Sequence, residues 1–123
     1  MQEVKSLKPE EAEKEIANGA VLIDVRHPKE IEFVEFAVEK RLEIPLLDLV
    51  QKMEELPSDC KLITSDFYGV NGFKAANMLQ YNGFENVSFI EGGLKAWGLD
   101  GYPLKYKVED SCSDGSCSGC TCC

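Results

Sequence analysis

The sequence lacks clusters of basic residues, long apolar runs and a recognisable signal peptide. Its 22 Asp and Glu outnumber 13 Lys and Arg, which gives a formal net charge of -9 at pH 7. Contacts with phosphates or acidic lipid need clusters of Lys and Arg, so we expect neither nucleic-acid nor membrane partners. The longest apolar runs, such as Val21 to Ile23, are far too short to span a bilayer. The start Met1-Gln2-Glu3 lacks the basic and apolar regions of a signal peptide, so we expect a cytoplasmic protein. We also expect it to be a monomer.

Cysteine is scarce in most of the chain and abundant at its end. Only Cys60 precedes residue 110, whereas the other five of the six cysteines follow it. Residues 110–123 contain no apolar aliphatic side chain, and such a segment cannot form a packed core. We therefore predict one domain over residues 1–108 and a flexible Cys-rich tail over residues 109–123. In a reducing compartment these cysteines are thiols or metal thiolates rather than disulfides.

The apolar pattern of the first 108 residues alternates between strand and helix. Short buried strands are predicted at 20–25, 61–65 and 87–90, and residues 28–36 are predicted to form a short helix and turn. Helices are predicted from Pro9 to Asn18-Gly19, from Ile44-Pro45 to Leu56, over residues 75–81, and after Gly92-Gly93. This order predicts an α/β domain with a mostly parallel central sheet and helices on both faces. Ligand sites in such folds lie at the carboxyl ends of the strands, where the loop 66–72 begins.

Several segments together resemble the rhodanese family over roughly residues 5–105. They are Val21-Leu22-Ile23-Asp24-Val25-Arg26, Ile44-Pro45, Ala75-Ala76 with Leu79, Gly83-Phe84-Glu85-Asn86-Val87, and Glu91-Gly92-Gly93-Leu94-Lys95-Ala96-Trp97. The resemblance implies a sulfurtransferase-like domain whose site is a six-residue loop. In active members a cysteine opens that loop, backbone N–H groups form an anion cradle, and an arginine closes it. Such a cradle lowers the pKa of a thiol and stabilises persulfide charge.

This chain departs from the family pattern within that loop. Alignment on Ala75-Ala76 puts Asp66 at the cysteine position and Asn71 at the arginine position, and of the usual residues only Gly69 remains. The rim segment before Ile44 is altered too, to Ala37-Val38-Glu39-Lys40-Arg41. Because a carboxylate has no sulfur to transfer and repels thiosulfate, we expect no catalytic residue of the usual kind. The loop equivalents are Asp66, Phe67, Tyr68, Gly69, Val70 and Asn71, and we expect a partner protein or a small anion to bind at residues 66–72.

Other candidate residues have simpler interpretations. Asp24 and Arg26 form the expected site wall, where internal hydrogen bonds order the end of a strand. His27 precedes Pro28 and is expected to be a solvated turn residue, and Cys60 a small, buried, inert thiol. Ser65 and Asp66 lack the base or magnesium ligands that a nucleophile of either type needs. The aromatic pair in the loop is either a packed lid or an exposed anchor for a partner, and Trp97 is expected in the core.

The tail has the spacing of a soft-metal binder. Its candidate ligands are Cys112, Cys117, Cys120, Cys122 and Cys123. Thiolates this close together suit Zn(II), Cu(I) or an iron–sulfur cluster, and the spacing does not choose among them. A tail of unmetallated reactive thiols is the alternative.

Three functions follow from these patterns. The first is a non-catalytic rhodanese-like module that binds or regulates in sulfur or metal handling. The second is a sulfurtransferase or sulfur carrier in which a tail cysteine, Cys117 or Cys120, carries the persulfide over the loop. The third is a receiver-like signalling domain, suggested by residues 22–28, but the acidic pair of a receiver is missing and the Gly-Gly-x-x-Ala-Trp pattern has no place in one.

Overall fold

A computed structural model describes residues 4–31, 34–57 and 59–106. Along the chain the elements are β1 (Lys5–Leu7), α1 (Pro9–Ala17), β2 (Val21–Asp24), α2 (Pro28–Ile31), β3 (Val34–Phe36), β4 (Arg41–Glu43), η1 (Leu46–Asp48), α3 (Leu49–Lys52), η2 (Met53–Glu55), β5 (Leu62–Ser65), α4 (Val70–Tyr81), β6 (Val87–Ile90), α5 (Gly93–Leu99) and β7 (Leu104–Tyr106). None of the helices in this part of the chain has the length and hydrophobicity needed to cross a bilayer.

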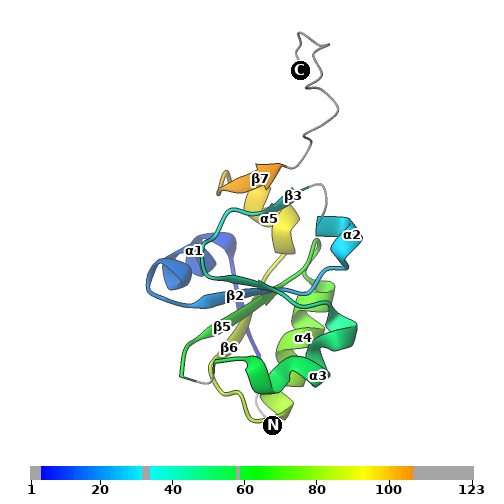
Figure 1. The fold of residues 1–123 in the computed structure, drawn as a ribbon. Coiled ribbons are helices and arrows are strands. Elements are labelled where there is room, and N and C mark those ends of the chain that lie inside the picture. The colour runs from blue at the N-terminus through cyan, green and yellow to red at the C-terminus, as the bar shows by residue number, and fades with distance from the viewer. Residues whose placement is uncertain (1–3, 32–33, 58, 107–123) are drawn as a thin grey trace, which may run out of the picture.

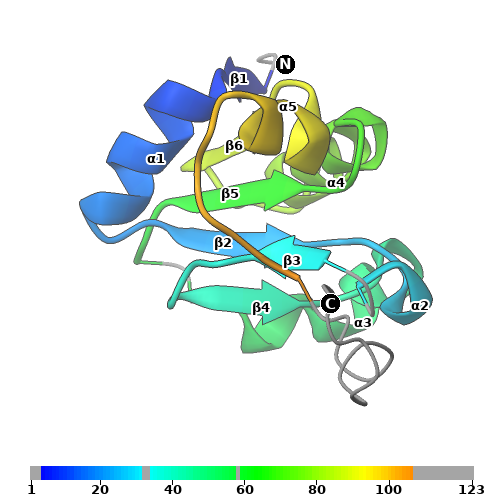
Figure 2. The same ribbon diagram turned by 90° about the horizontal axis from the view of Figure 1, so that it is seen from above.

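Five strands form a parallel sheet in the order β1-β6-β5-β2-β4 (Figures 1 and 2). All four residues of β5 are buried, as expected of a strand that lies between two others and is covered on both faces. The predicted α/β class with a mostly parallel sheet is confirmed. The strands point the same way, so β2 and β5 deliver Asp24 and Ser65 to one edge of the sheet in paired register.

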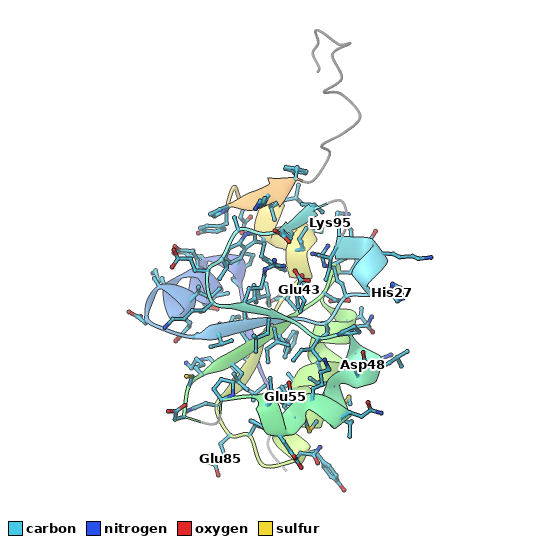
Figure 3. All side chains as sticks on the ribbon, in the orientation of Figure 1. His27, Glu43, Asp48, Glu55, Glu85 and Lys95 are labelled. Carbon is cyan, nitrogen blue, oxygen red and sulfur yellow. The ribbon has the colours of Figure 1, made fainter. Side chains whose placement is uncertain are left out.

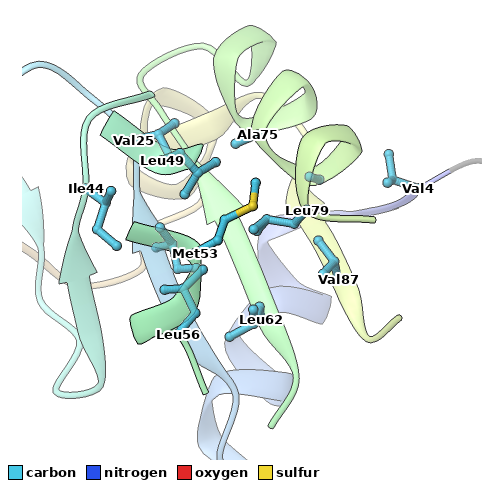
Figure 4. Close-up of a cluster of buried hydrophobic side chains, with 12 residues drawn as sticks. Val4, Val25, Ile44, Leu49, Met53, Leu56, Leu62, Ala75, Leu79 and Val87 are labelled. Atoms are coloured by element: carbon cyan, nitrogen blue, oxygen red, sulfur yellow. The ribbon is translucent and has the colours of Figure 1, made fainter. Parts of the chain in front are cut away.

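Helices cover both faces of this sheet and create two apolar layers (Figure 1). On one face α3 and α4 pack over a cluster that includes Leu49, Met53 and Leu79 (Figure 4). On the other face α1 and α5 pack over a cluster built around Leu22 and Trp97. Trp97 is 1% exposed, which confirms its predicted core position.

A second, two-stranded sheet was not expected from the sequence. Val34 and Phe36, predicted to lie in a helix and turn, instead form β3, which pairs antiparallel with β7. The buried ring of Phe36 meets Trp97 edge-on at 5.4 Å between centroids, so tertiary packing rather than local periodicity determines this conformation. Two other three-residue strands, β1 and β4, were also missed, because three residues are too few to display a period of two.

The first helix follows the expected sequence signals. Pro9 occupies its first position, and the backbone N–H of Lys8 donates to Glu11 Oε1 at 3.0 Å. Gly19, with φ of 106°, follows its end. The chain then enters β2, which pairs with β5 so that Asp24 lies opposite Ser65 and beside the loop that follows it.

Candidate functional site

The loop between β5 and α4 is held in place by the start of α5. The backbone N–H groups of Leu94 and Lys95 donate to the carbonyls of Asp66 and Phe67, at 2.8 and 3.0 Å. Gly93 makes this approach feasible, since a Cβ there would lie 2.5 Å from the Asp66 carbonyl oxygen. The Gly-Gly pattern at the start of α5 therefore allows this helix to approach and support the loop.

Gly69 reverses the chain immediately before α4. Its φ is 97°, and a Cβ at this position would lie 2.9 Å from the backbone nitrogen of Gly92. Only glycine combines this left-handed conformation with so close a contact. This requirement explains why Gly69 is present in a loop that otherwise differs from the family pattern.

The carboxylate of Asp66 turns back into its own loop. It is 6% exposed and accepts hydrogen bonds from the backbone N–H groups of Gly69 at 2.5 Å, Asn71 at 3.1 Å and Gly72 at 3.3 Å. Successive N–H groups that converge in this way make an anion-binding nest. The nest is therefore filled by an anion that belongs to the protein itself.

A buried ion network lies at the same edge of the sheet. Arg26 donates from Nε and Nη2 to the Asp24 carboxylate, at 3.0 and 2.8 Å for the shortest contacts, and both residues are almost fully buried. Arg41 Nη2 donates to Glu35 Oε1 at 2.8 Å, and Arg41 Nη1 lies 2.7 Å from Glu43 Oε2 without the alignment of a hydrogen bond. The network connects β2, β3 and β4 beside the loop. Charged groups that are removed from water need partners of opposite charge, and the network supplies them.

A pocket of about 620 Å³ opens beside Asp66. It is lined by Arg26, Lys29, Val34, Asp66, Phe67, Tyr68, Val70 and Asn71. Most of the predicted loop residues and one half of the predicted site wall therefore meet at one concave surface. Asp24 does not line it, because its carboxylate is turned to Arg26.

The two loop aromatics have different environments. Phe67 is half-buried against the cluster that contains Trp97, whereas Tyr68 is 62% exposed. Their rings meet edge-on at 4.6 Å, and Lys95 Nζ lies 5.5 Å from the Tyr68 ring centroid. Phe67 thus has the environment of a packed lid, and Tyr68 has the exposure expected of a surface anchor.

The candidates His27 and Cys60 contribute nothing to the pocket beside Asp66. His27 is exposed, and its Nδ1 accepts a hydrogen bond from the backbone N–H of Lys29 at 3.1 Å, as in a turn. Cys60 precedes β5 and shares a different pocket with Glu85, which lies at the far end of the molecule from Lys95 (Figure 3). Cys60 is half-exposed, so its predicted burial is wrong, because the turn before β5 leaves it at the surface.

The tail cysteines all lie outside the described residues, as does the predicted domain boundary near residue 108. Within residues 4–31, 34–57 and 59–106, no group of three or more His, Cys, Asp or Glu side chains could hold a metal ion. Elsewhere in the fold, the pKa of the Tyr102 phenol is perturbed by its surroundings. Partial burial, followed by the carboxylates of Glu10, Glu13 and Asp100, raises the pKa of this phenol above 10.0.

Sequence reasoning missed the roles of Glu35 and Arg41. The sequence places Arg41 only in an altered rim segment, and Glu35 only within residues 28–36, which are predicted to form a short helix and turn. An available signal is the position of these charges, because Glu35 lies between Val34 and Phe36 and Arg41 directly precedes Leu42. Charges that apolar neighbours draw into the core need partners of opposite sign. Neither partner could be named without the pairing of β3 and β4 with the rest of the fold.

Comparison with known proteins agrees with this geometry. A family model for the rhodanese-like domain matches residues 8–100. The thiosulfate sulfurtransferase GlpE of Ectopseudomonas mendocina is 30% identical over 97 residues, which are 79% of this chain and 87% of that protein. A rhodanese-related protein from Thermoplasma volcanium has a TM-score of 0.74 at 28% identity, covering 82% of this chain and 97% of its own. The reduced CoADR-RHD protein of Bacillus anthracis has a TM-score of 0.71 at 33% identity, covering 77% of this chain and 16% of its own. The chain belongs to the rhodanese-like domain family.

Proposed function

We propose that this rhodanese-like domain is a non-catalytic binding and regulatory module in sulfur or metal handling. The observation that carries the proposal is the position of the Asp66 carboxylate, which accepts the N–H groups of Gly69, Asn71 and Gly72. In the family pattern a cysteine takes the place of Asp66 and its transferred sulfur uses these donors. Here the donors are already occupied.

Sulfur transfer by the usual route needs two things at this loop. A sulfur nucleophile must accept the sulfane atom, and free N–H groups must stabilise the resulting persulfide anion. Asp66 has no sulfur, and its negative charge opposes a second anion in the same nest. The relatives named thiosulfate sulfurtransferase and sulfurtransferase support a link to sulfur chemistry for this domain. The filled nest favours binding over turnover.

The Cys-rich tail supplies the second part of the proposal. Cys117 and Cys120 have the spacing of a metal-binding knuckle, and Cys112, Cys122 and Cys123 add further thiolates. Thiolate ligands select soft metals such as Zn(II) and Cu(I), or an iron–sulfur cluster. The tail holds the metal or the sulfur, and the domain provides the surface that a partner recognises.

A sulfur carrier that uses a tail cysteine is the second candidate. It is favoured by the end of β7, because Tyr106 lines a pocket that shares Phe67 with the pocket beside Asp66. Cys117 lies eleven positions after Tyr106, and an extended chain of that length spans at most about 40 Å. A persulfide on Cys117 would reach the loop, although the Asp66 charge opposes it there.

The test is one anaerobic preparation of the full chain assayed twice, for bound metal and sulfide and for thiosulfate-to-cyanide sulfur transfer. We expect bound metal, no transfer, and loss of the metal when the five tail cysteines are replaced by serine. Turnover that disappears in the serine variant would instead establish the carrier.

Two loop variants separate the nucleophile from the cradle. Asp66→Cys alone restores the sulfur but not the arginine, so we expect little transfer, whereas Asp66→Cys with Asn71→Arg restores both. Transfer at rates typical of the sulfurtransferase relatives in the single variant would contradict the view that the whole loop has been rebuilt.

A further inference from the structure

Large apolar side chains are concentrated beside the loop. The exposed large hydrophobic residues of the described chain are Leu47, Val50, Tyr68, Val70, Phe73, Tyr81, Leu99 and Tyr106. Half of them line two pockets, Tyr68 and Val70 in the pocket of about 620 Å³ and Leu99 and Tyr106 in one of about 340 Å³. Exposed apolar surface that gathers in this way marks an interaction site more often than single scattered residues do.

The two pockets are neighbours. Both are lined by Val34 and Phe67, so the half-buried Phe67 ring forms part of the wall of each. We call the pair the Phe67 groove. It offers two separate apolar depressions rather than one deep cavity, which suits two side chains of an extended segment better than one small molecule.

Charge in the Phe67 groove is opposite to that of the chain. Two exposed lysines, Lys29 and Lys95, line it together with one acid, Asp66, and with Arg26, whose charge is compensated by Asp24. The whole chain, in contrast, carries a net charge of -9. The Asp66 carboxylate is bonded to three N–H groups, which offset its charge locally. One lysine lies at each pocket, so each apolar depression has a cation beside it.

We propose that the Phe67 groove binds an extended acidic segment of a partner protein that places one large apolar side chain in each pocket. The inference rests on the proposed function, because it names the class of partner that the binding surface accepts. Lys29 and Lys95 pair with carboxylates that flank the two apolar anchors, and Tyr68 covers the first anchor from the solvent side.

The acidic tail of this chain fits the Phe67 groove less well than a partner segment with two large apolar side chains. The tail, residues 109–123, begins three residues after Tyr106 and carries Glu109, Asp110 and Asp114, so its charge is suitable. Residues 109–123 contain no aliphatic or aromatic side chain, however, and therefore cannot fill two apolar pockets.

The test uses the full chain, immobilised through an amino-terminal tag, to select from a displayed library of random 12-residue peptides. We expect the selected peptides to carry two large apolar residues among Asp and Glu. The best peptide is then synthesised with a fluorescent label, and its Kd for each variant is measured by polarisation. Failure to enrich any peptide, or enrichment of basic peptides, would overturn the proposal.

Matched pairs of exposed residues make the second stage specific. Tyr68→Ser and Leu99→Ser should each weaken the peptide about tenfold or more. Tyr81→Ser and Leu47→Ser remove the same side-chain types at 77% and 90% exposure, line neither pocket, and should leave the Kd unchanged. Equal weakening by test and control variants would place the peptide elsewhere and refute the groove.

Charge and the tail are tested in the same assay. Lys95→Glu should weaken the peptide more at low salt than at high salt, whereas the exposed Lys52→Glu, which makes the same change in net charge, should not. Tightening by tenfold in the variant Glu109→Ser/Asp110→Ser/Asp114→Ser would show that the tail occupies the groove and would overturn the external partner. Sulfur transfer by the same preparation would refute the proposed function without affecting peptide binding, so the two failures are distinguishable.

Discussion

Replacing Asp66 by alanine tests whether its carboxylate organises the loop. The variant removes the acceptor of three backbone N–H groups, two within 3.1 Å and one at 3.3 Å. A hydrogen bond to a charged group contributes about 1.5–3 kcal/mol, and the 3.3 Å contact contributes less. Water from the adjacent pocket of about 620 Å³ can replace part of the loss. We therefore expect the free energy of unfolding to fall by about 2–4 kcal/mol.

The assay is urea unfolding of the wild type, Asp66→Ala and the control Asp48→Ala. Asp48 is exposed, makes no side-chain cap hydrogen bond to its helix, and is labelled in Figure 3. Its replacement should change the free energy of unfolding by no more than about 0.5 kcal/mol. An unchanged slope with denaturant would show that the midpoints report stability alone.

Formate makes the experiment specific to the nest. If the emptied N–H groups bind formate with a Kd of about 10 mM, then 100 mM formate should raise the free energy of unfolding of Asp66→Ala by about 1.4 kcal/mol, relative to the same concentration of chloride. The wild type and Asp48→Ala should gain little. The reasoning is refuted if Asp66→Ala is as stable as the wild type, or if formate stabilises all three proteins equally.

Three further outcomes are expected, each with its own control. Gly93→Ala should lower the free energy of urea unfolding by about 2–4 kcal/mol, because the added Cβ would lie 2.5 Å from the Asp66 carbonyl oxygen. In the control Gly101→Ala, where φ is 86° and the site is open, only the backbone strain of about 1 kcal/mol is expected. Equal losses in the two variants would exclude the clash. Asp24→Asn removes the carboxylate charge that faces the buried Arg26 guanidinium and should lower the free energy of unfolding by about 3–5 kcal/mol. Glu10→Gln, which breaks an exposed pair, should lower it by less than about 0.5 kcal/mol, and an equally small loss for Asp24→Asn would show that the fold tolerates removal of the buried charge. The raised pKa of Tyr102 favours the neutral phenol in the folded protein, so its contribution to stability is complete below pH 10.0 and declines as pH rises through the folded pKa. Unfolding midpoints of the wild type and Tyr102→Phe should therefore converge or cross only in alkali, and a constant difference from pH 8 to 12 would contradict the shift.

The sequence predicted the elements whose signals are local. The strand expected at 61–65 is β5 (Leu62–Ser65), and the strand expected at 87–90 is β6 with the same bounds. Both are apolar runs between turn residues. The short strands β1, β3, β4 and β7 could not be predicted, because their conformation depends on partners that lie far away in sequence, such as residues 104–106 for β3.

The candidate site was predicted in its residues but not in its geometry. The family resemblance implied that Asp66 stands at the cysteine position of an anion cradle. Sequence alone did not indicate that the carboxylate turns inward and bonds to Gly69, Asn71 and Gly72, since that depends on the backbone path of the loop. Nor did it show that Phe67 would be half-buried while Tyr68 stands exposed.

The strand order has a consequence for how this protein acquires its structure during synthesis. β1 is made first, yet among the described strands it pairs with β6, and the carbonyls of the loop accept hydrogen bonds from the amides of residues 94 and 95. A growing chain therefore exposes unpaired apolar strands until at least residue 95 has left the ribosome. Pairings between such distant segments fold slowly and leave partly folded chains open to aggregation. Because the loop and the sheet edge are completed by the same late segment, the binding surface should form together with the whole fold rather than before it.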